Sequence, residues 1–204
     1  ATMVVSASGT ANLRKAFRIL NRFMLLMWRL GLGRWMAGPR RGYVMVLITK
    51  GRKTGLRRLV PLNFAEDPGS VFCLAGFGKT THWLVNLLAD PQCEVWLPDG
   101  RRLLGTAELV TNERRRIELV RRILVRAGFA TAVAEPGLDP RLASDAEIAA
   151  LGERYGHRYA AVEIRLDGAA TGPGGPGELA WVLPLGAVAS TAAGIWMMRR
   201  RRVA

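Results

Sequence analysis

The chain has 204 residues, of which 50% are hydrophobic and 23% are charged. This length and composition predict one globular domain, with room for an appendage, and exclude a disordered or fibrous protein. Lysine and arginine number 30 against 16 aspartate and glutamate, a formal net charge of +14. Such a charge indicates an anionic partner: a phosphorylated cofactor, a membrane surface or nucleic acid. Two cysteines exclude a disulfide scaffold.

The positive charge lies mainly at the two ends of the chain. Thirteen basic residues precede the first acidic residue, Glu66, and Arg199–Arg202 form a second basic cluster. Charges that serve only solubility would alternate with acidic residues. We therefore expect the two basic segments to contact an anionic partner.

The first predicted element is an amphipathic helix over Leu13–Leu30, in an N-terminal segment spanning residues 1–38. Basic side chains share one side of this helix, and Phe, Leu, Met and Trp occupy much of the rest. Such a helix can lie in a membrane interface, or it can cap the core of the domain. The pattern favours the two interpretations equally, and they are compatible.

Residues 39–168 form the predicted domain. Alternating apolar residues predict strands at Tyr43–Lys50, Arg58–Ala65, Ser70–Ala75, Glu94–Leu97, Arg101–Val110 and Tyr159–Leu166. Helices are predicted at Thr81–Asp90, at Asn112–Ala127 with Thr111 as its cap and Gly128 at its end, and from the capping box Ser144–Glu147 to Gly152. Short strands in hairpin succession predict a mainly β fold with helices (α+β), built on an antiparallel barrel or closed sheet.

A Gly/Pro linker over residues 169–178 precedes an uncharged segment, Leu179–Met198, and a basic tail, residues 199–204. Twenty residues of helix reach about 30 Å, the thickness of a hydrocarbon core. Trp181 and Trp196 stand near the two ends of the segment, where indoles prefer the interface. We therefore predict a transmembrane helix. The alternative is a buried C-terminal helix of the domain.

The predicted span carries a stripe of small residues, Gly186, Ser190 and Gly194, which would allow a partner helix to approach closely in lipid. The positive-inside rule would place Arg199–Arg202 in the cytoplasm and the domain outside. A single-pass C-terminal anchor with a cytoplasmic domain is the localisation we expect, because it requires only six C-terminal residues to cross.

The turn between the first two strands, residues 49–58 (TKGRKTGLRR), is the densest basic cluster outside the chain ends. Its two glycines free the backbone, and the four cationic side chains from Arg52 to Arg58 can surround phosphate or carboxylate oxygens. A solvated hairpin tip is the alternative. A second segment, residues 75–81 (AGFGKTT), joins a strand to a helix N-terminus and could bind an anion or the edge of a ring.

The sequence lacks the residues that nucleotide-binding motifs and metal sites require. A P-loop would require glycine at Cys73, and a dinucleotide fingerprint would require glycine at Thr81. His82 and His157 are the only histidines, and no metal-ligand pattern accompanies them. We therefore expect any enzymatic reactivity to come from an organic cofactor.

The runs MVLITKGRKTGLRRLVPL and AGFGKTTHWLVNLLADP resemble the deazaflavin-dependent nitroreductase family of split-barrel flavin and deazaflavin oxidoreductases. The resemblance extends from Phe17 to Leu166. It implies an FMN-binding-like split β-barrel and hydride transfer from reduced coenzyme F-420 to a quinone, a nitroaromatic compound or an enone. FMN is the alternative cofactor, since related split barrels bind it.

Carried over to this chain, the resemblance implies that the basic turn binds the phosphate and acidic tail of coenzyme F-420, that the glycine segment contacts the ring, and that the following helix closes the pocket. The implied residues are Arg52, Lys53, Thr54, Arg58 and Pro61, then Ala75, Gly76, Phe77 and Gly78, then Trp83 and Asn86. His82 is a candidate proton donor, although a histidine at a helix start is more often a solvated or capping residue.

Two departures from the family pattern stand on the substrate side, where Asn63 and Leu84 occupy positions at which we expect aromatic residues. The sequence therefore leaves two functions open. One is a membrane-tethered reductase acting on a lipid-soluble quinone, and the other is a non-catalytic accessory subunit of a membrane complex. Nucleic acid is not an expected partner, because the apolar face of the basic N-terminal segment suits lipid or core better than stacked bases.

Overall fold

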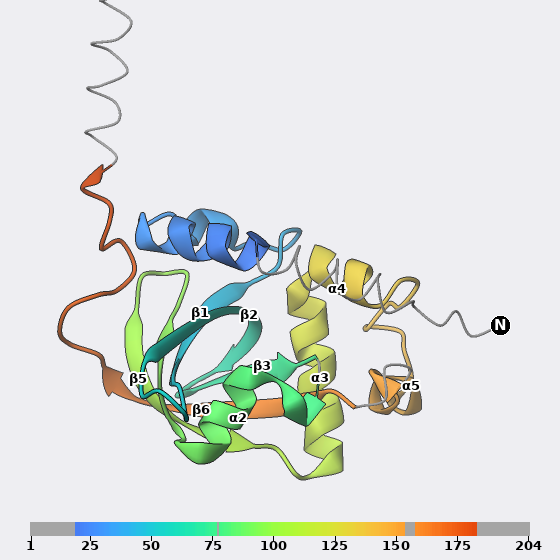
Figure 1. Cartoon of the computed structure of the whole chain (residues 1–204). Helices are drawn as coiled ribbons and strands as arrows, with labels where there is room; N and C mark the ends of the chain where they lie inside the picture. Colours follow the sequence, from blue (N-terminus) through green and yellow to red (C-terminus); the bar gives the residue numbers. More distant parts are fainter. Residues whose placement is uncertain (1–18, 77, 154–157, 183–204) are drawn as a thin grey trace, which may run out of the picture.

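The computed structural model describes residues 19–76, 78–153 and 158–182. Six antiparallel strands close into a barrel in the order β1-β2-β3-β6-β5-β4 (Figure 1), which confirms the predicted closed antiparallel sheet. The strands are β1 (Val44–Lys50), β2 (Arg57–Asp67), β3 (Ser70–Ala75), β4 (Gln92–Trp96), β5 (Arg102–Leu109) and β6 (Ala160–Ala169). Each predicted strand is present, with ends shifted by a few residues.

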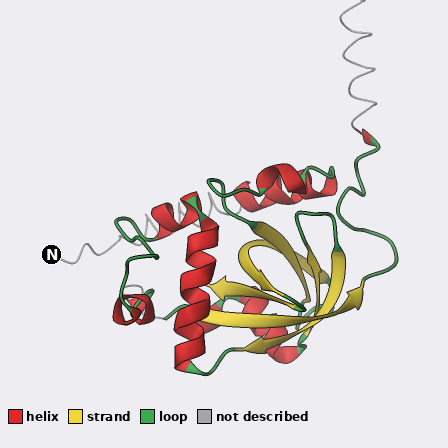
Figure 2. Ribbon diagram, turned by 180° about the vertical axis from the view of Figure 1, so that it is seen from behind, coloured by secondary structure: helices red, strands yellow, loops and turns green. Residues whose placement is uncertain are grey.

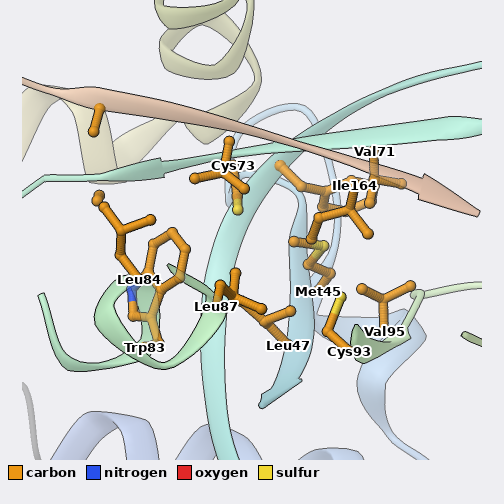
Figure 3. Close-up of a cluster of buried hydrophobic side chains, with 14 of the residues drawn as sticks. Met45, Leu47, Val71, Cys73, Trp83, Leu84, Leu87, Cys93, Val95 and Ile164 are labelled. Atoms are coloured by element: carbon orange, nitrogen blue, oxygen red, sulfur yellow. The ribbon is translucent and has the colours of Figure 1, made fainter. Parts of the chain in front are cut away.

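The interior of the barrel is filled by alternate side chains from all six strands. Met45 and Leu47 of β1 meet Val71 and Cys73 of β3 and Ile164 of β6 there (Figure 3). Helix α2 (His82–Ala89) adds Trp83, Leu84 and Leu87 to the same cluster. The apolar face of α2 therefore holds this helix against the barrel, with its first turn directly after the glycine segment.

Helices cover the outside of the barrel (Figure 2). Residues 19–29 are helical, and Trp28 from this helix is buried against Val46 and Trp96 on the outer face of β1 and β4. The predicted N-terminal helix thus caps part of the core. The short 3-10 helix η1 (Gly33–Met36) follows it.

Helix α3 (Glu113–Ala127) covers the outer face of β2, β3 and β6 with Leu119 and Ile123. Its predicted end at Gly128 is confirmed, but the predicted cap is wrong: the side chain of Asn112, not Thr111, accepts a hydrogen bond from the Arg115 backbone N–H at 2.9 Å. The short helix α5 (Asp145–Ala149) carries both reciprocal bonds of its predicted capping box.

Helix α4 (Phe129–Ala134) is absent from the sequence-based prediction. It begins directly after Gly128, whose positive φ of 57° turns the chain between the two helices. The prediction treated Gly128 as a stop followed by a loop, because a six-residue helix offers too few apolar positions to show a period.

The predicted transmembrane segment lies outside the described residues from residue 183 onward, and so do Gly186, Ser190, Gly194 and the basic tail. Its first residues, Leu179–Trp181, form turns. Among residues 19–182, with 77 and 154–157 set aside, no helix is long and apolar enough to cross a bilayer.

Candidate functional site

The tip of the β1–β2 hairpin is a tight turn over residues 51–56. The Gly51 N–H donates to the Leu56 carbonyl at 2.9 Å, and the Gly55 N–H donates to the Gly51 carbonyl at 2.7 Å. Gly55 has a φ of 68°, which favours glycine. A Cβ on Gly51 would lie 3.0 Å from Thr54 Oγ1, so this position is closely packed as well. The two glycines therefore serve the shape of the turn.

Three cations of the turn have no carboxylate partner in the described part of the chain. The side chains of Arg52, Lys53 and Arg58 are exposed, and within the described part of the chain none of them forms an ion pair. Arg58 donates only to Thr54 Oγ1, at 3.3 Å. Of the four cations predicted between Arg52 and Arg58 to surround an anion, these three lack a carboxylate partner in the described structure, whereas Arg57 pairs with Glu94.

Asn86 ties this turn to α2. Its side-chain oxygen accepts from the Arg52 backbone N–H at 3.3 Å and from Arg52 Nη1 at 3.5 Å. Its Nδ2 donates to Thr49 Oγ1 at 3.2 Å, and both Asn86 and Thr49 are buried. The predicted residues Arg52 and Asn86 are thus brought together from two separate motifs.

Thr49 is the contact residue that the sequence-based prediction missed. Its hydroxyl holds the Asn86 amide, which in turn orients Arg52. A signal was present, since Thr49 is the first residue of the Thr-x-Gly-Arg-Lys run that carries the family resemblance.

The glycine segment lies at the other end of the same helix. Strand β3 ends at Ala75, and a 3-10 turn, η2 (Gly78–Thr80), leads into α2. A Cβ on Gly76 would meet nothing within 4 Å, so there is open space beside this backbone. Gly78 has a φ of 62°, and its carbonyl accepts from Thr81 Oγ1 at 2.8 Å. Phe77 lies outside the described residues.

The remaining predicted residues differ in where they lie. Trp83 is buried in the barrel core beside α2, and His82 is exposed at the first position of that helix. Pro61 is buried in β2 directly opposite Val46, which packs beneath the N-terminal helix on the outer face. Directly opposed residues share one face of a sheet. The structure therefore separates Pro61 from the turn and α2.

A pocket of about 480 Å³ opens on the outer face of the barrel. Of the predicted cofactor residues it contacts only Arg58. The turn and the glycine segment flank α2, and this pocket does not join them.

Metal and thiol chemistry find no support among the described residues. No group of three or more metal-ligand side chains comes together in that part of the chain. Burial raises the pKa of the Cys93 thiol to about 12 and also raises that of Cys73, so neither thiol ionises readily.

Comparison with known proteins gives the following similarities. Residues 30–133, half of the chain, match the family model for F420H(2)-dependent quinone reductase. An F420-H2 dependent reductase is 25% identical over 60% of this chain and 93% of its own, with a TM-score of 0.41. An F420 reductase is 17% identical over 65% and 92%, with a TM-score of 0.40. A conserved hypothetical protein from Mycobacterium tuberculosis is 17% identical over 67% and 87%, with a TM-score of 0.44. The family match includes the cationic turn, the glycine segment and α2.

Proposed function

Because the chain belongs to the F420H(2)-dependent quinone reductase family, whose cofactor is coenzyme F-420, we propose that it reduces a quinone-like acceptor by hydride transfer. The observation that carries this proposal is the set of unneutralised cations at the turn, Arg52, Lys53 and Arg58, next to α2. Nitroaromatic compounds and enones are the other acceptor classes that we propose to test.

The residues present fit a polyanionic, ring-bearing cofactor. Lys53 and Arg58 would bind phosphate or carboxylate oxygens, and Asn86 would hold Arg52 in position for the same task. The open space beside Gly76 leaves room for a flat group at the start of α2. When bound, the deazaflavin supplies the hydride, and the protein contributes binding and orientation.

The decisive experiment is a titration of coenzyme F-420 fluorescence with the full chain, followed by assay of quinone reduction. We expect saturable binding that weakens steeply with added salt, because charged contacts dominate. Removal of the turn cations Lys53 and Arg58 should weaken binding, whereas the control variant Arg114→Ala should bind like the wild type. Arg114 suits this control because it is an exposed arginine on α3 without an ion-pair partner in the described structure. Absence of binding by the wild-type chain would contradict the proposal and favour the accessory-subunit alternative.

We also propose that the enzyme works at a membrane surface. The helix over residues 19–29 and α4 lie along the same side of the molecule (Figures 1 and 2). This side exposes large apolar side chains, namely Ile19, Leu20, Phe23 and Leu26 of the helix and Phe129 and Val133 of α4. Exposed apolar patches of this kind are typical of interaction sites, and a lipid-soluble quinone is concentrated in the bilayer.

Cosedimentation with anionic lipid vesicles tests this location. We expect the Phe23→Asp variant to bind vesicles at least several-fold more weakly than the wild type. The Leu88→Asp variant is its control, because Leu88 is equally exposed but lies on α2, on the opposite side of the barrel. An equal effect of the two substitutions would contradict the proposed membrane face.

A further inference from the structure

The segment that follows β6 packs along the outer face of the barrel. Arg102 Nη1 donates to the Gly172 carbonyl at 2.7 Å. Further along, the Gly177 N–H donates to the Trp28 carbonyl at 2.9 Å and the Leu179 N–H to the Arg29 carbonyl at 2.7 Å. Residues 170–179, which we name the strap, are therefore bonded both to the barrel and to the end of the N-terminal helix.

The strap forms part of the wall of the open pocket of about 480 Å³ on the outer face of the barrel. Pockets of about 300–1,000 Å³ are typical of sites for small molecules. The lining combines three apolar side chains with three arginines: Leu25, Leu59, Trp96, Arg29, Arg57 and Arg58, with Gly174 and Glu178 from the strap. One ligand could therefore meet both a cationic and an apolar surface.

The arginines of this pocket retain binding capacity. Arg57 pairs with Glu94 at 2.8 Å, and Arg29 pairs with Glu178, but the side chains of Arg57 and Arg29 are still 48% and 45% exposed. A guanidinium has five N–H donors, so one carboxylate does not saturate it. Arg58 has no carboxylate partner among the described residues.

Glu94 keeps Arg57 in this position. Burial would raise the pKa of Glu94, but hydrogen bonds from Arg102 and Trp96 and the nearby charge of Arg57 outweigh it, so the pKa lies below its ordinary value. The carboxylate therefore stays ionised at neutral pH. Arg57 is anchored on the outer face, whereas its neighbour Arg58 lies opposite the buried Thr49 that contacts α2.

We propose that this pocket binds an amphiphile with a carboxylate or phosphate head and an apolar chain. The head would contact Arg29 and Arg57, and the chain would cover the half-buried Leu25 and Leu59 beside the buried Trp96. A free phosphate ion would leave the apolar side chains of the pocket exposed to water. The acidic tail of coenzyme F-420 has no apolar group that would cover these side chains either. Arg58 is the one predicted cofactor residue that lines this pocket, and the inference does not depend on the proposed reductase activity.

Protection of an introduced cysteine tests the site in the full chain. Leu25 lines the pocket, whereas its neighbour Leu26 is exposed outside it. The native Cys73 and Cys93 are buried, so a polar maleimide will react mainly with the introduced thiol. The probes are dodecanoate and dodecyl phosphate below their micelle concentrations, with dodecanol and inorganic phosphate as controls.

We expect at least one of the two acidic amphiphiles to slow labelling of the Leu25→Cys variant at least tenfold and that of the Leu26→Cys variant less than twofold. Comparison of the two heads distinguishes a fatty acid from a lipid phosphate as the source. Adding Arg57→Gln should abolish the protection, whereas adding Arg34→Gln, at an exposed arginine outside the pocket, should not.

Three results would overturn the proposal: equal protection at both cysteines, equal protection by dodecanol, or full protection by inorganic phosphate alone. Equal protection of the cysteines at positions 25 and 26 would show that the amphiphile adsorbs on the exposed face of the N-terminal helix and does not enter the pocket. Because coenzyme F-420 binding is measured separately, failure of this pocket leaves the cofactor proposal unaffected, and the reverse also holds. A direct count of bound dodecyl phosphate on the wild-type chain, expected at one per protein, supplies a readout that no substitution can disturb.

Discussion

Two arginine-rich regions of this protein differ in how their charges are paired. On α3, four arginines form ion pairs, with Arg115 to Glu118, Arg116 to Glu113, Arg121 to Asp145 and Arg122 to Asp67. At the β1–β2 turn, Arg52, Lys53 and Arg58 form none among the described residues. Density of basic residues alone therefore does not identify a binding site. What distinguishes Arg52, Lys53 and Arg58 is that they are exposed and have no carboxylate partner in the part of the chain that the structure describes.

The paired arginines of α3 attach this helix to the rest of the fold. Arg122 reaches Asp67 at the end of β2, and Arg116 donates to the carbonyls of Tyr159 and Ala149 at 3.1 and 3.2 Å. Among the described residues, the turn is connected to the rest of the fold through Asn86 and through the ion pairs of Lys50 with Asp90 and Arg57 with Glu94, whereas Arg52, Lys53 and Arg58 form no ion pair. We expect substitutions on α3 to change stability and substitutions at the turn to change ligand affinity.

The largest expected effect is on α3. Arg116→Met keeps the aliphatic bulk but removes the buried guanidinium and its hydrogen bonds to the carbonyls of Tyr159 and Ala149, which should lower the free energy of unfolding by about 3 kcal/mol. Urea denaturation measures this loss. Affinity for coenzyme F-420, measured on the folded variant, should stay within about twofold of the wild type, because a purely structural role predicts no change in ligand binding.

The turn should behave in the opposite way. A double variant, Lys53→Ala with Arg58→Ala, removes two charge-assisted contacts, and affinity for coenzyme F-420 should fall about 100-fold. Its melting temperature should remain near that of the wild type, since neither side chain forms an ion pair with any residue that the structure describes. A large drop in stability with unchanged affinity for coenzyme F-420 would show that the cations of the turn stabilise the fold, like those of α3, and do not bind the cofactor.

Substitution of Asn86 should affect both stability and cofactor affinity, because this residue is buried and also contacts Arg52. Asn86→Ala should cost about 1.5 kcal/mol of stability, since the hydroxyl of Thr49 loses its partner, and should weaken cofactor binding about tenfold. Asn112→Ala is the control asparagine. Loss of this helix cap should cost about 1 kcal/mol and leave cofactor affinity unchanged.

The smallest effect concerns pH. A hydrogen bond and the charge of Arg122 hold the pKa of Asp67 below its ordinary value. The ionised carboxylate therefore stabilises the fold above its unfolded pKa of about 3.9, and this contribution is lost as the pH falls through the lower folded pKa. Asp67→Asn should cost less than about 1 kcal/mol at pH 7, because the pair is partly exposed, and this cost should shrink as the pH falls below the unfolded pKa of about 3.9. A constant difference between wild type and variant from pH 7 to pH 3 would contradict this assignment.

Local patterns were sufficient for most of the fold. Alternation predicts all six strands, and the capping box Ser144–Glu147 predicts the start of α5, because both depend on residues close in sequence. Local patterns failed where competing signals were close together, as at Thr111 and Asn112, and where an element was very short, as at α4. They also did not show that the strap packs against Trp28 and Arg29, because those contacts are remote in sequence.

The sequence by itself determined the barrel and the basic turn, since strand period, turn glycines and helix caps act over a few residues. Only the tertiary structure decided which cations remain free. The carboxylate that neutralises Arg57 lies 37 residues away at Glu94, and the one that neutralises Arg122 lies 55 residues away at Asp67. Charge compensation therefore depends on which distant strands meet, and the unpaired cations of the turn became visible only after the barrel had closed.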